Sequence, residues 1–160
     1  MFKSWMKFKE LMIKKLINLI KKKPSFSEII EKLLDLSAYA KFRKKYNIHP
    51  NFKFNGTGIK FFGDGIIFCK ENSYIGRYSY IQSLKGYKVI IGKGTSISHF
   101  VMIYTSNRSA DQDLNVSYDK ILKVGGDVHI GNYCWIGAQT IINPGIKIGD
   151  NSVIGANSII

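Results

Sequence analysis

The chain has 160 residues, with 24 Lys or Arg against 11 Asp or Glu and a formal net charge of +13. This length is enough for one sizeable core, and no run of about 18 uncharged apolar residues is present to cross a membrane. The positive charge suits nucleic acids, but no groove-reading or base-stacking motif accompanies it, so we expect no nucleic-acid partner.

The first fifty residues are predicted to be a basic helical segment. Residues 1–50 hold 13 of the Lys and Arg residues and only 4 of the acidic ones. In residues 1–23, apolar side chains share one helical face and lysines occupy the rest. The apolar set is Phe2, Trp5, Met6, Ile13, Leu16, Ile17 and Ile20. Such a helix suits an anionic membrane surface, which predicts peripheral membrane contact. The alternative is that it packs on its own chain or on a neighbouring subunit.

A second helix is predicted over roughly residues 26–46, after Pro24 ends the first pattern. Ser25 followed three residues later by Glu28 is a capping box, in which each side chain satisfies a backbone N–H at the start of the helix. We expect the apolar face of this helix to consist of Ile29, Ile30, Leu33 and Leu34.

The last fifth of the chain repeats with a strict period of six. Neither a helix (period 3.6) nor an ordinary strand (period 2) gives this spacing, whereas a hexapeptide repeat does, with one short strand and one tight turn per unit. Gly or Asn follows most of the repeated isoleucines and accepts positive φ at a corner. The isoleucines are Ile130, Ile136, Ile142, Ile148, Ile154 and Ile160. We therefore predict an all-β fold, a parallel β-helix.

The repeat continues upstream in broken form, from Cys69 to Ile103. The spacing between Ile81 and Ile91 is ten, which implies a four-residue insertion around Ser83–Gly86. The period disappears in the polar segment 104–126, and a long unpatterned loop inside a solenoid is usually functional. We predict a β-helix domain over residues 51–160 with this loop inserted.

The cysteine pattern indicates a reducing compartment. Cys69 and Cys134 both fall at inward positions of the repeat, so we expect reduced core thiols in a cytoplasmic protein. The N-terminal apolar stretch is interrupted by Lys14 and Lys15 and has no small-residue cleavage site, which makes it a poor secretory signal.

Two segments carry a resemblance to a known family. The run WIGAQTIINPGIKIGDNSVIGANSII, residues 135–160, resembles the C-terminal coils of hexapeptide-repeat O-acetyltransferases of the maltose and galactoside type. The segment IGKGTSISHFVMIYTS, residues 91–106, is similar to their central coils and looks most like the acyltransferases of surface-polysaccharide synthesis. The resemblance implies a left-handed β-helix, a homotrimer and acetyl-CoA in a cleft between subunits. The implied acceptor is a sugar, a sugar nucleotide or a polysaccharide precursor.

Acyl transfer from a thioester to a hydroxyl or amine needs a base for the acceptor proton, and histidine is the usual one. The chain contains only three histidines. His49 lies in the junction before the repeat, and His129 points outward from a flat face. We expect His99, at a corner of the β-helix, to be the catalytic base; His129 and a mechanism without a histidine base are the alternatives. A zinc-dependent carbonic anhydrase of the same fold needs two histidines on one loop. His49, His99 and His129 do not offer such a pair, so we expect no metal.

Three residues are candidates for binding coenzyme A, and two of them match family positions. Ala138 and Ala156 each follow a corner glycine and correspond to residues whose backbone contacts the pantetheine arm. Trp135 stands on an outward face together with Val153, eighteen residues later. A Trp on the outside of a solenoid needs a cover, so we expect it to line the CoA cleft; plain packing between subunits is the alternative.

The inserted loop departs from the family pattern. In the maltose type the base stands in a motif like T-x-x-H-P, but the matching run from Thr105 has Arg108 at the histidine position. Arginine stays protonated and cannot act as a base. We expect Arg108, Asp111 and Asp113 to contact an acidic acceptor, or else to form an internal cluster that orders the loop. The replacement also supports the main alternative function, an inactive trimeric scaffold or binding protein.

Overall fold

The computed structural model describes residues 25–113 and 115–160, and the predicted amphipathic helix over residues 1–23 lies outside them. The chain divides after Ala40 into two compact units. The first is described over residues 25–40, and the second comprises the described part of 41–160. The domain boundary at residue 50 stays a prediction. The described residues include no helix that is both long and apolar enough to span a bilayer.

Helix α2 (Phe26–Lys45) begins and ends close to the predicted bounds. Its capping box is present, because Ser25 N–H donates to Glu28 Oε2 at 2.9 Å and Glu28 N–H donates to Ser25 Oγ at 3.3 Å. The predicted apolar face is not the buried face of this helix. Ile30, Leu33 and Leu34 are exposed, Leu34 by 67%, whereas Leu36 and Tyr39 are buried. The buried stripe follows residues farther along the helix, because amphipathic spacing alone does not say which stripe meets a partner.

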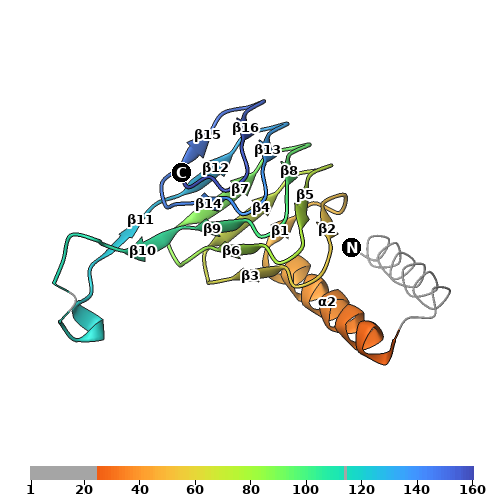
Figure 1. Cartoon of the computed structure of the whole chain (residues 1–160), viewed down its shortest axis with the longest axis horizontal. Helices are drawn as coiled ribbons and strands as arrows, with labels where there is room; N and C mark the ends of the chain where they lie inside the picture. Colours follow the sequence, from red (N-terminus) through yellow and green to blue (C-terminus); the bar gives the residue numbers. More distant parts are fainter. Residues whose placement is uncertain (1–24, 114) are drawn as a thin grey trace. The chain divides into compact units, whose positions relative to one another are not determined.

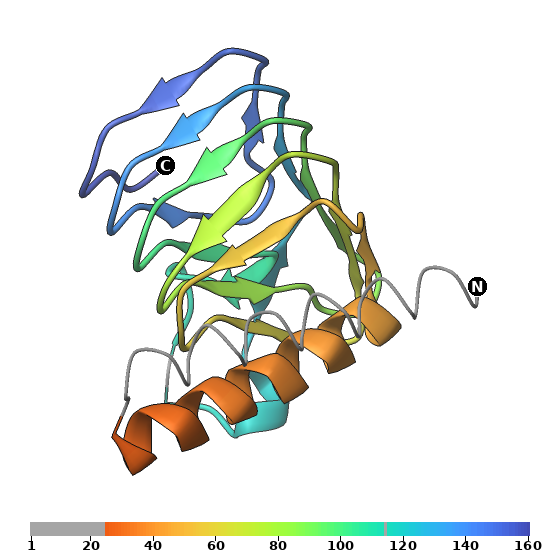
Figure 2. The same ribbon diagram turned by 90° about the vertical axis from the view of Figure 1, so that its right-hand side faces the viewer.

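The second unit is a parallel β-helix whose strands form three sheets (Figure 1). In spatial order, the first sheet contains β1 (Asn47–Ile48), β4 (Ile66–Cys69), β7 (Lys88–Ile91), β12 (Val128–Ile130) and β15 (Lys147–Ile148). The second contains β2 (Lys53–Asn55), β5 (Tyr74–Gly76), β8 (Ser96–Ile97), β13 (Trp135–Ile136) and β16 (Val153–Ile154). The third contains β3 (Lys60–Phe62), β6 (Tyr80–Gln82), β9 (Met102–Tyr104) and β14 (Ile141–Ile142). Figure 2 shows the successive coils stacked one above the other. The predicted all-β fold with a helix before it is confirmed.

The isoleucine positions of the repeat form the core. In the second sheet, Ile75, Ile97 and Ile136 are in register on consecutive coils and are fully buried. Each buried isoleucine stabilises the fold by roughly 1.5–3 kcal/mol relative to an exposed one. Cys69 and Cys134 take core positions as free, buried thiols, as predicted. Burial raises the pKa of the Cys69 thiol well above its usual range.

The first coil is covered by aromatic rings. Phe42 stacks on Phe61 with ring centroids 5.3 Å apart, and Phe52, Phe54 and Tyr46 complete the cluster. Arg43 lies over the Phe54 ring at 5.3 Å. An uncovered first coil would expose the apolar end of the solenoid to water, and these ring contacts shield it.

Both interruptions of the repeat lie where the spacing predicts them. The four-residue insertion forms a turn in which Tyr87 N–H donates to the Leu84 carbonyl at 3.0 Å. The long loop starts after β9 and contains β10 (Ser106–Arg108), a short 3₁₀ turn, η1 (Tyr118–Lys120), and β11 (Lys123–Gly125). Strands β10 and β11 pair antiparallel, so the loop is a hairpin that extends away from the coils (Figure 1). Gly126 N–H donates to the Thr105 carbonyl at 3.0 Å and closes its base.

Candidate active site

The turns between the second and third sheets form one continuous edge of the β-helix, which we call the His99 corner. It consists of residues 76–78, 98–100, 137–139 and 155–157 on four successive coils. A backbone hydrogen bond links each turn to the next: Phe100 N–H to the Arg77 carbonyl, Gln139 N–H to the His99 carbonyl and Asn157 N–H to the Ala138 carbonyl, at 2.9 to 3.0 Å. Arg77, His99, Ala138 and Ala156 therefore stand in one line along this edge.

His99 is half-buried and is held by the coil beneath it. The backbone N–H of Arg77 donates a hydrogen bond to His99 Nδ1 at 3.2 Å. Gly76 leaves the space that the ring occupies, since a Cβ there would come within 2.5 Å of Nδ1. The imidazole thus rests in a notch made by the backbone of residues 76 and 77, which fixes the orientation of its two nitrogens.

Two aromatic residues stabilise the same edge. Tyr78 and Phe100 have left-handed backbone angles, with φ of 54° and 59°, which bulky residues rarely adopt. Their rings stack with centroids 5.4 Å apart, and the Tyr78 ring lies over Gly58, where a Cβ would approach within 2.4 Å. Stacking of about 0.5–1.5 kcal/mol offsets part of the backbone strain and keeps the turns in line.

The residues predicted to bind coenzyme A lie close to His99 in the fold. Ala138 is on the coil directly above His99, and Ala156 is one coil further. Trp135 belongs to the strand that leads into the same turn, in register with Ser96 and Val153. The Trp135 and Val153 side chains are 57% and 65% exposed and present an apolar surface beside the corner.

The three predicted acceptor residues do not reach this corner within one chain. Strand β9 separates His99 from the hairpin, on which Arg108, Asp111 and Asp113 are exposed. Asp113 Oδ1 accepts a hydrogen bond of 2.8 Å from Asn115 N–H and so orders its own turn. Arg108 stands directly opposite Lys123 in the β10–β11 ladder. This register places two cationic side chains close together on the hairpin.

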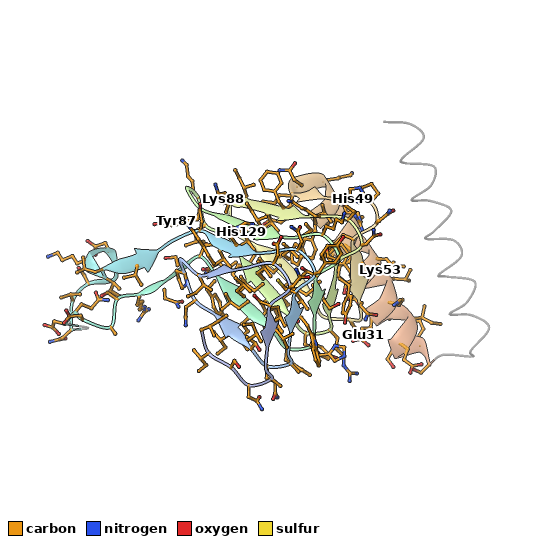
Figure 3. The ribbon with its side chains drawn as sticks, turned by 90° about the horizontal axis from the view of Figure 1, so that it is seen from above. Glu31, His49, Lys53, Tyr87, Lys88 and His129 are labelled. Atoms are coloured by element: carbon orange, nitrogen blue, oxygen red, sulfur yellow. The ribbon has the colours of Figure 1, made fainter. Side chains whose placement is uncertain are left out.

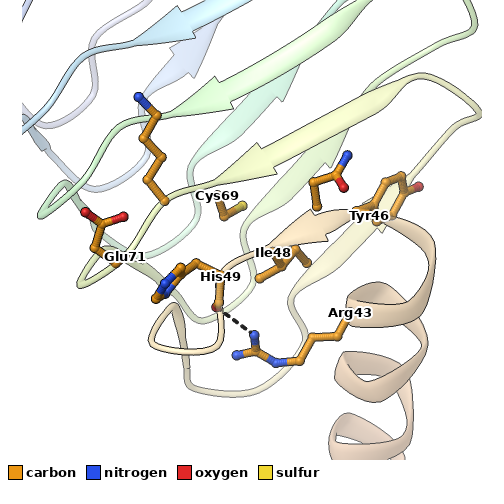
Figure 4. Close-up of a pocket in the computed structure, with 8 residues that line it drawn as sticks. Arg43, Tyr46, Ile48, His49, Cys69 and Glu71 are labelled. Atoms are coloured by element: carbon orange, nitrogen blue, oxygen red, sulfur yellow. Dashed lines mark hydrogen bonds between the residues drawn. The ribbon is translucent and has the colours of Figure 1, made fainter. Parts of the chain in front are cut away.

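The other two histidines lie elsewhere. His129 is exposed on the outer face of the first sheet, between Ile90 and Lys147 and on the same side of the molecule as Lys88 (Figure 3). His49 borders a shallow hollow of about 500 Å³ at the start of the β-helix (Figure 4). Among residues 25–113 and 115–160, no three His, Cys, Asp or Glu side chains are grouped to hold a metal ion.

The hollow beside His49 is a structural junction. Arg43 lines it and donates to the His49 carbonyl at 2.9 Å and to the Phe52 carbonyl at 2.6 Å, which holds the first turn of the β-helix against the end of α2. Burial lowers the pKa of the Arg43 guanidinium. The lining also includes the buried Cys69. The hydrogen bonds of Arg43 connect α2 to the first turn of the β-helix.

The comparisons with known proteins agree with this fold. Residues 127–160 match the family model "Bacterial transferase hexapeptide (six repeats)". The chain carries a hexapeptide domain. Over 137 residues it is 28% identical to a lipopolysaccharide biosynthesis O-acetyl transferase, WbbJ, of Escherichia coli K12, and the match covers 81% of this chain and 68% of WbbJ. Over 94 residues it is 36% identical to the galactoside O-acetyltransferase of the same strain, covering 56% of this chain and 45% of that protein.

A solved structure with the same architecture is AntD, an N-acyltransferase from Bacillus cereus in complex with dTDP and 3-hydroxybutyryl-CoA. The TM-score is 0.52 and the identity 19%, over 73% of this chain and 66% of AntD. At this identity the likeness shows the fold. The hexapeptide domain is therefore built like those of acyltransferases, and the curated relatives above are named as acetyltransferases.

The contact of His99 with the backbone of Gly76 and Arg77 does not follow from side-chain motifs, although the spacing of the repeat predicts it. Arg77 and His99 are 22 residues apart, which is one 18-residue turn of three repeats plus the four-residue insertion. This arithmetic puts residue 77 directly beneath residue 99. Side-chain motifs do not reveal such a contact, because the donor is a backbone N–H.

Proposed function

We propose that this chain is a CoA-dependent acyltransferase, with acetyl-CoA as donor and a sugar, sugar nucleotide or surface-polysaccharide precursor as acceptor. The observation that supports it most is the His99 corner, on which one potential reacting side chain and two of the predicted CoA-binding positions stand in line. The names of the two E. coli relatives support transfer to a sugar and favour an oxygen acceptor.

The donor would lie along the corner. Backbone groups at Ala138 and Ala156 suit the amides of the pantetheine arm, and the exposed indole of Trp135 suits its apolar stretches. The thioester carbonyl would then be near His99. A single chain offers only one wall here, so a second subunit is needed to enclose the donor.

A homotrimer would supply that wall. Outward faces that carry Trp135 with Val153, and Ile141 with the 71% exposed Ile159, are apolar surfaces of the kind that oligomers cover. Three-fold closure would also bring the hairpin of one subunit to the His99 corner of another subunit. Within one chain, the hairpin does not reach this corner.

The hairpin would then hold the acceptor. The facing cations Arg108 and Lys123 suit a phosphate or carboxylate, with Asp111 and Asp113 as further polar contacts. An acidic acceptor, such as a nucleotide-linked sugar, fits this charge better than a neutral sugar. The two buried free thiols support a cytoplasmic location. Membrane contact through residues 1–23 stays a prediction.

Incubation of the purified chain with acetyl-CoA and a panel of neutral and nucleotide-linked sugars tests the function. Mass spectrometry of the products should show acetylated sugar, calorimetry should give CoA binding in the micromolar to millimolar range typical of such substrates, and light scattering should give a trimer. A stable monomer at micromolar concentration would contradict the inter-subunit site. A trimer that neither binds nor consumes acetyl-CoA would favour the scaffold.

A further inference from the structure

Helix α2 carries an apolar stripe that the described part of the chain leaves exposed. The stripe, which we call the α2 stripe, consists of Phe26, Ile30, Leu33 and Leu34. Residues three and four positions apart share one face of a helix, so these four side chains are neighbours. Their exposed fractions are 78%, 41%, 48% and 67%. Large apolar side chains gathered in one place, rather than scattered singly, mark an interaction surface.

Two lysines extend the α2 stripe toward the end of the helix. At about 3.6 residues per turn, Lys44 lies five turns after Phe26, and Lys41 lies roughly three turns after Ile30. Both lysines are exposed. They therefore stand on the same side of the helix as the apolar residues, and they place two ammonium groups in line with them.

The acidic residues of the same helix lie on another side. Counted at about 100° per residue, Glu28, Glu31 and Asp35 are each more than roughly 110° around the helix axis from the centre of the α2 stripe. Glu28 forms the capping box with Ser25, and Asp35 is buried. The exposed face is therefore apolar in its first half and basic in its second half, and it contains no carboxylate of α2 itself.

The charge of this face distinguishes between the surfaces that could cover it. A second copy of the chain would bring another pair of lysines to the contact. Residues 1–23 contain eight lysines and one glutamate, so they would also add positive charge. Nucleic acid offers phosphates but no apolar layer for leucine and isoleucine side chains. An anionic lipid surface offers both an apolar layer and negative charge.

We propose that the α2 stripe, together with Lys41 and Lys44, is a docking surface for an anionic lipid bilayer. The helix would lie in the plane of the headgroups, with its apolar side chains at the boundary with the acyl chains and its ammonium groups among the lipid phosphates. This surface differs from the segment 1–23, for which the sequence predicts membrane contact. The proposal does not rest on acyl transfer.

A fluorescent label at Leu34 reports directly what covers the stripe. In full-length Leu34→Cys the introduced thiol is accessible, whereas Cys69 and Cys134 are buried, so a polarity-sensitive dye such as NBD attaches at position 34. We expect its emission to brighten and shift to the blue with vesicles of phosphatidylcholine and phosphatidylglycerol, but not with phosphatidylcholine alone. High salt should weaken the response, because it screens the lysines.

Two other results with this label would overturn the proposal. A blue-shifted emission without vesicles that grows with protein concentration would mean that a second copy covers the stripe. A blue-shifted emission without vesicles that does not depend on concentration would mean that the chain's own residues 1–23 cover it. An emission that stays unshifted with anionic vesicles would exclude contact with lipid.

Substitutions separate the apolar contribution from the electrostatic one, with vesicle co-sedimentation of the full-length chain as the measurement. Leu33→Ser combined with Leu34→Ser should weaken binding to the anionic vesicles by about 10–100-fold, because two side chains lose their burial in the lipid. Lys41→Gln combined with Lys44→Gln should weaken it by about 25-fold, or roughly fivefold for each lysine. All four residues are exposed, so the Tm should stay unchanged.

The matched control removes equally exposed apolar side chains from another element. Leu122 and Val124 on the hairpin are 62% and 50% exposed, and Leu122→Ser combined with Val124→Ser should leave the lipid affinity unchanged. An equal loss in this control would show that the effect is not specific to α2. Unchanged affinity in both α2 variants would place lipid binding in another part of the chain, and either result would overturn the proposal.

Discussion

Two regions contribute to the proposed site, and they are built in different ways. The coils of the His99 corner repeat a fixed backbone geometry, and the contacts that position His99 come from main-chain groups. The hairpin between Thr105 and Gly126 has no repeat and presents charged side chains on two short strands. The coils can therefore position a donor and a reacting group reproducibly, whereas the hairpin can change with the acceptor. Three substitutions and one loop replacement test this division.

Removing core volume from a coil should have the largest effect on stability. Ile103 is fully buried and in register with Ile81 and Ile142 on the coils below and above. Ile103→Ala should destabilise the fold by about 2–5 kcal/mol, because it leaves a cavity between stacked coils. Urea unfolding measures the change. The control is Val124→Ala on the hairpin, where the side chain is 50% exposed; a similar loss there would mean that the hairpin is part of the core.

Shortening the hairpin should abolish acceptor turnover and spare the coils. Replacing residues 109–122 by Asn-Gly joins β10 to β11 through a two-residue turn that such a hairpin accepts. We expect an unchanged Tm and unchanged CoA affinity, but a fall in acetyl transfer of about 10²-fold, if acceptor binding energy is lost. Calorimetry measures the CoA affinity, and a product assay measures the rate of acetyl transfer. Weaker CoA binding in the shortened chain would place the donor on the hairpin as well.

Arg108→Ala should have a smaller effect confined to the acceptor. Loss of one charged hydrogen bond corresponds to about 1.5–3 kcal/mol, or roughly 10–100-fold in acceptor KM. The Tm should stay the same, because the Arg108 side chain is exposed on the hairpin. A lower Tm with normal kinetics would assign Arg108 a structural role. Arg108→Lys is the matched variant that keeps the charge and loses the bidentate geometry.

The smallest expected effect is a pH-dependent one at another corner. Asp150 accepts hydrogen bonds from the backbone and side chain of Asn132 at 2.7 and 3.0 Å, and these hold the pKa of its carboxyl below the usual value. A lowered folded-state pKa stabilises the protein above the unfolded value of about 3.9 and loses this contribution as the pH falls through the folded pKa. Asp150→Asn should therefore unfold slightly more easily than wild type at pH 7 and equally at pH 2. A constant difference across this range would exclude the carboxylate as its origin.

The parts of the fold that follow from local spacing could be predicted from the sequence. A period of six fixes strand and corner positions. The spacing therefore predicts that His99, Ala138 and Ala156 are aligned on successive coils, and that Trp135 is in register with Val153. Contacts that depend on the side-chain rotamer or on the choice of partner could not. The hydrogen bond on His99 Nδ1, the buried stripe of α2 and the Arg108–Lys123 pairing in the hairpin are of this kind.

The aromatic cover on the first coil has a consequence for how copies of this chain can assemble. Parallel strands at the end of a solenoid are templates for another solenoid to stack on, and end-to-end growth of this type gives open filaments. Phe42 and Tyr46 lie against Phe61 where such a neighbour would have to pack. The cover thus gives the stack a polarity: at this end, a second copy cannot extend the sheets without first displacing a cluster of packed rings.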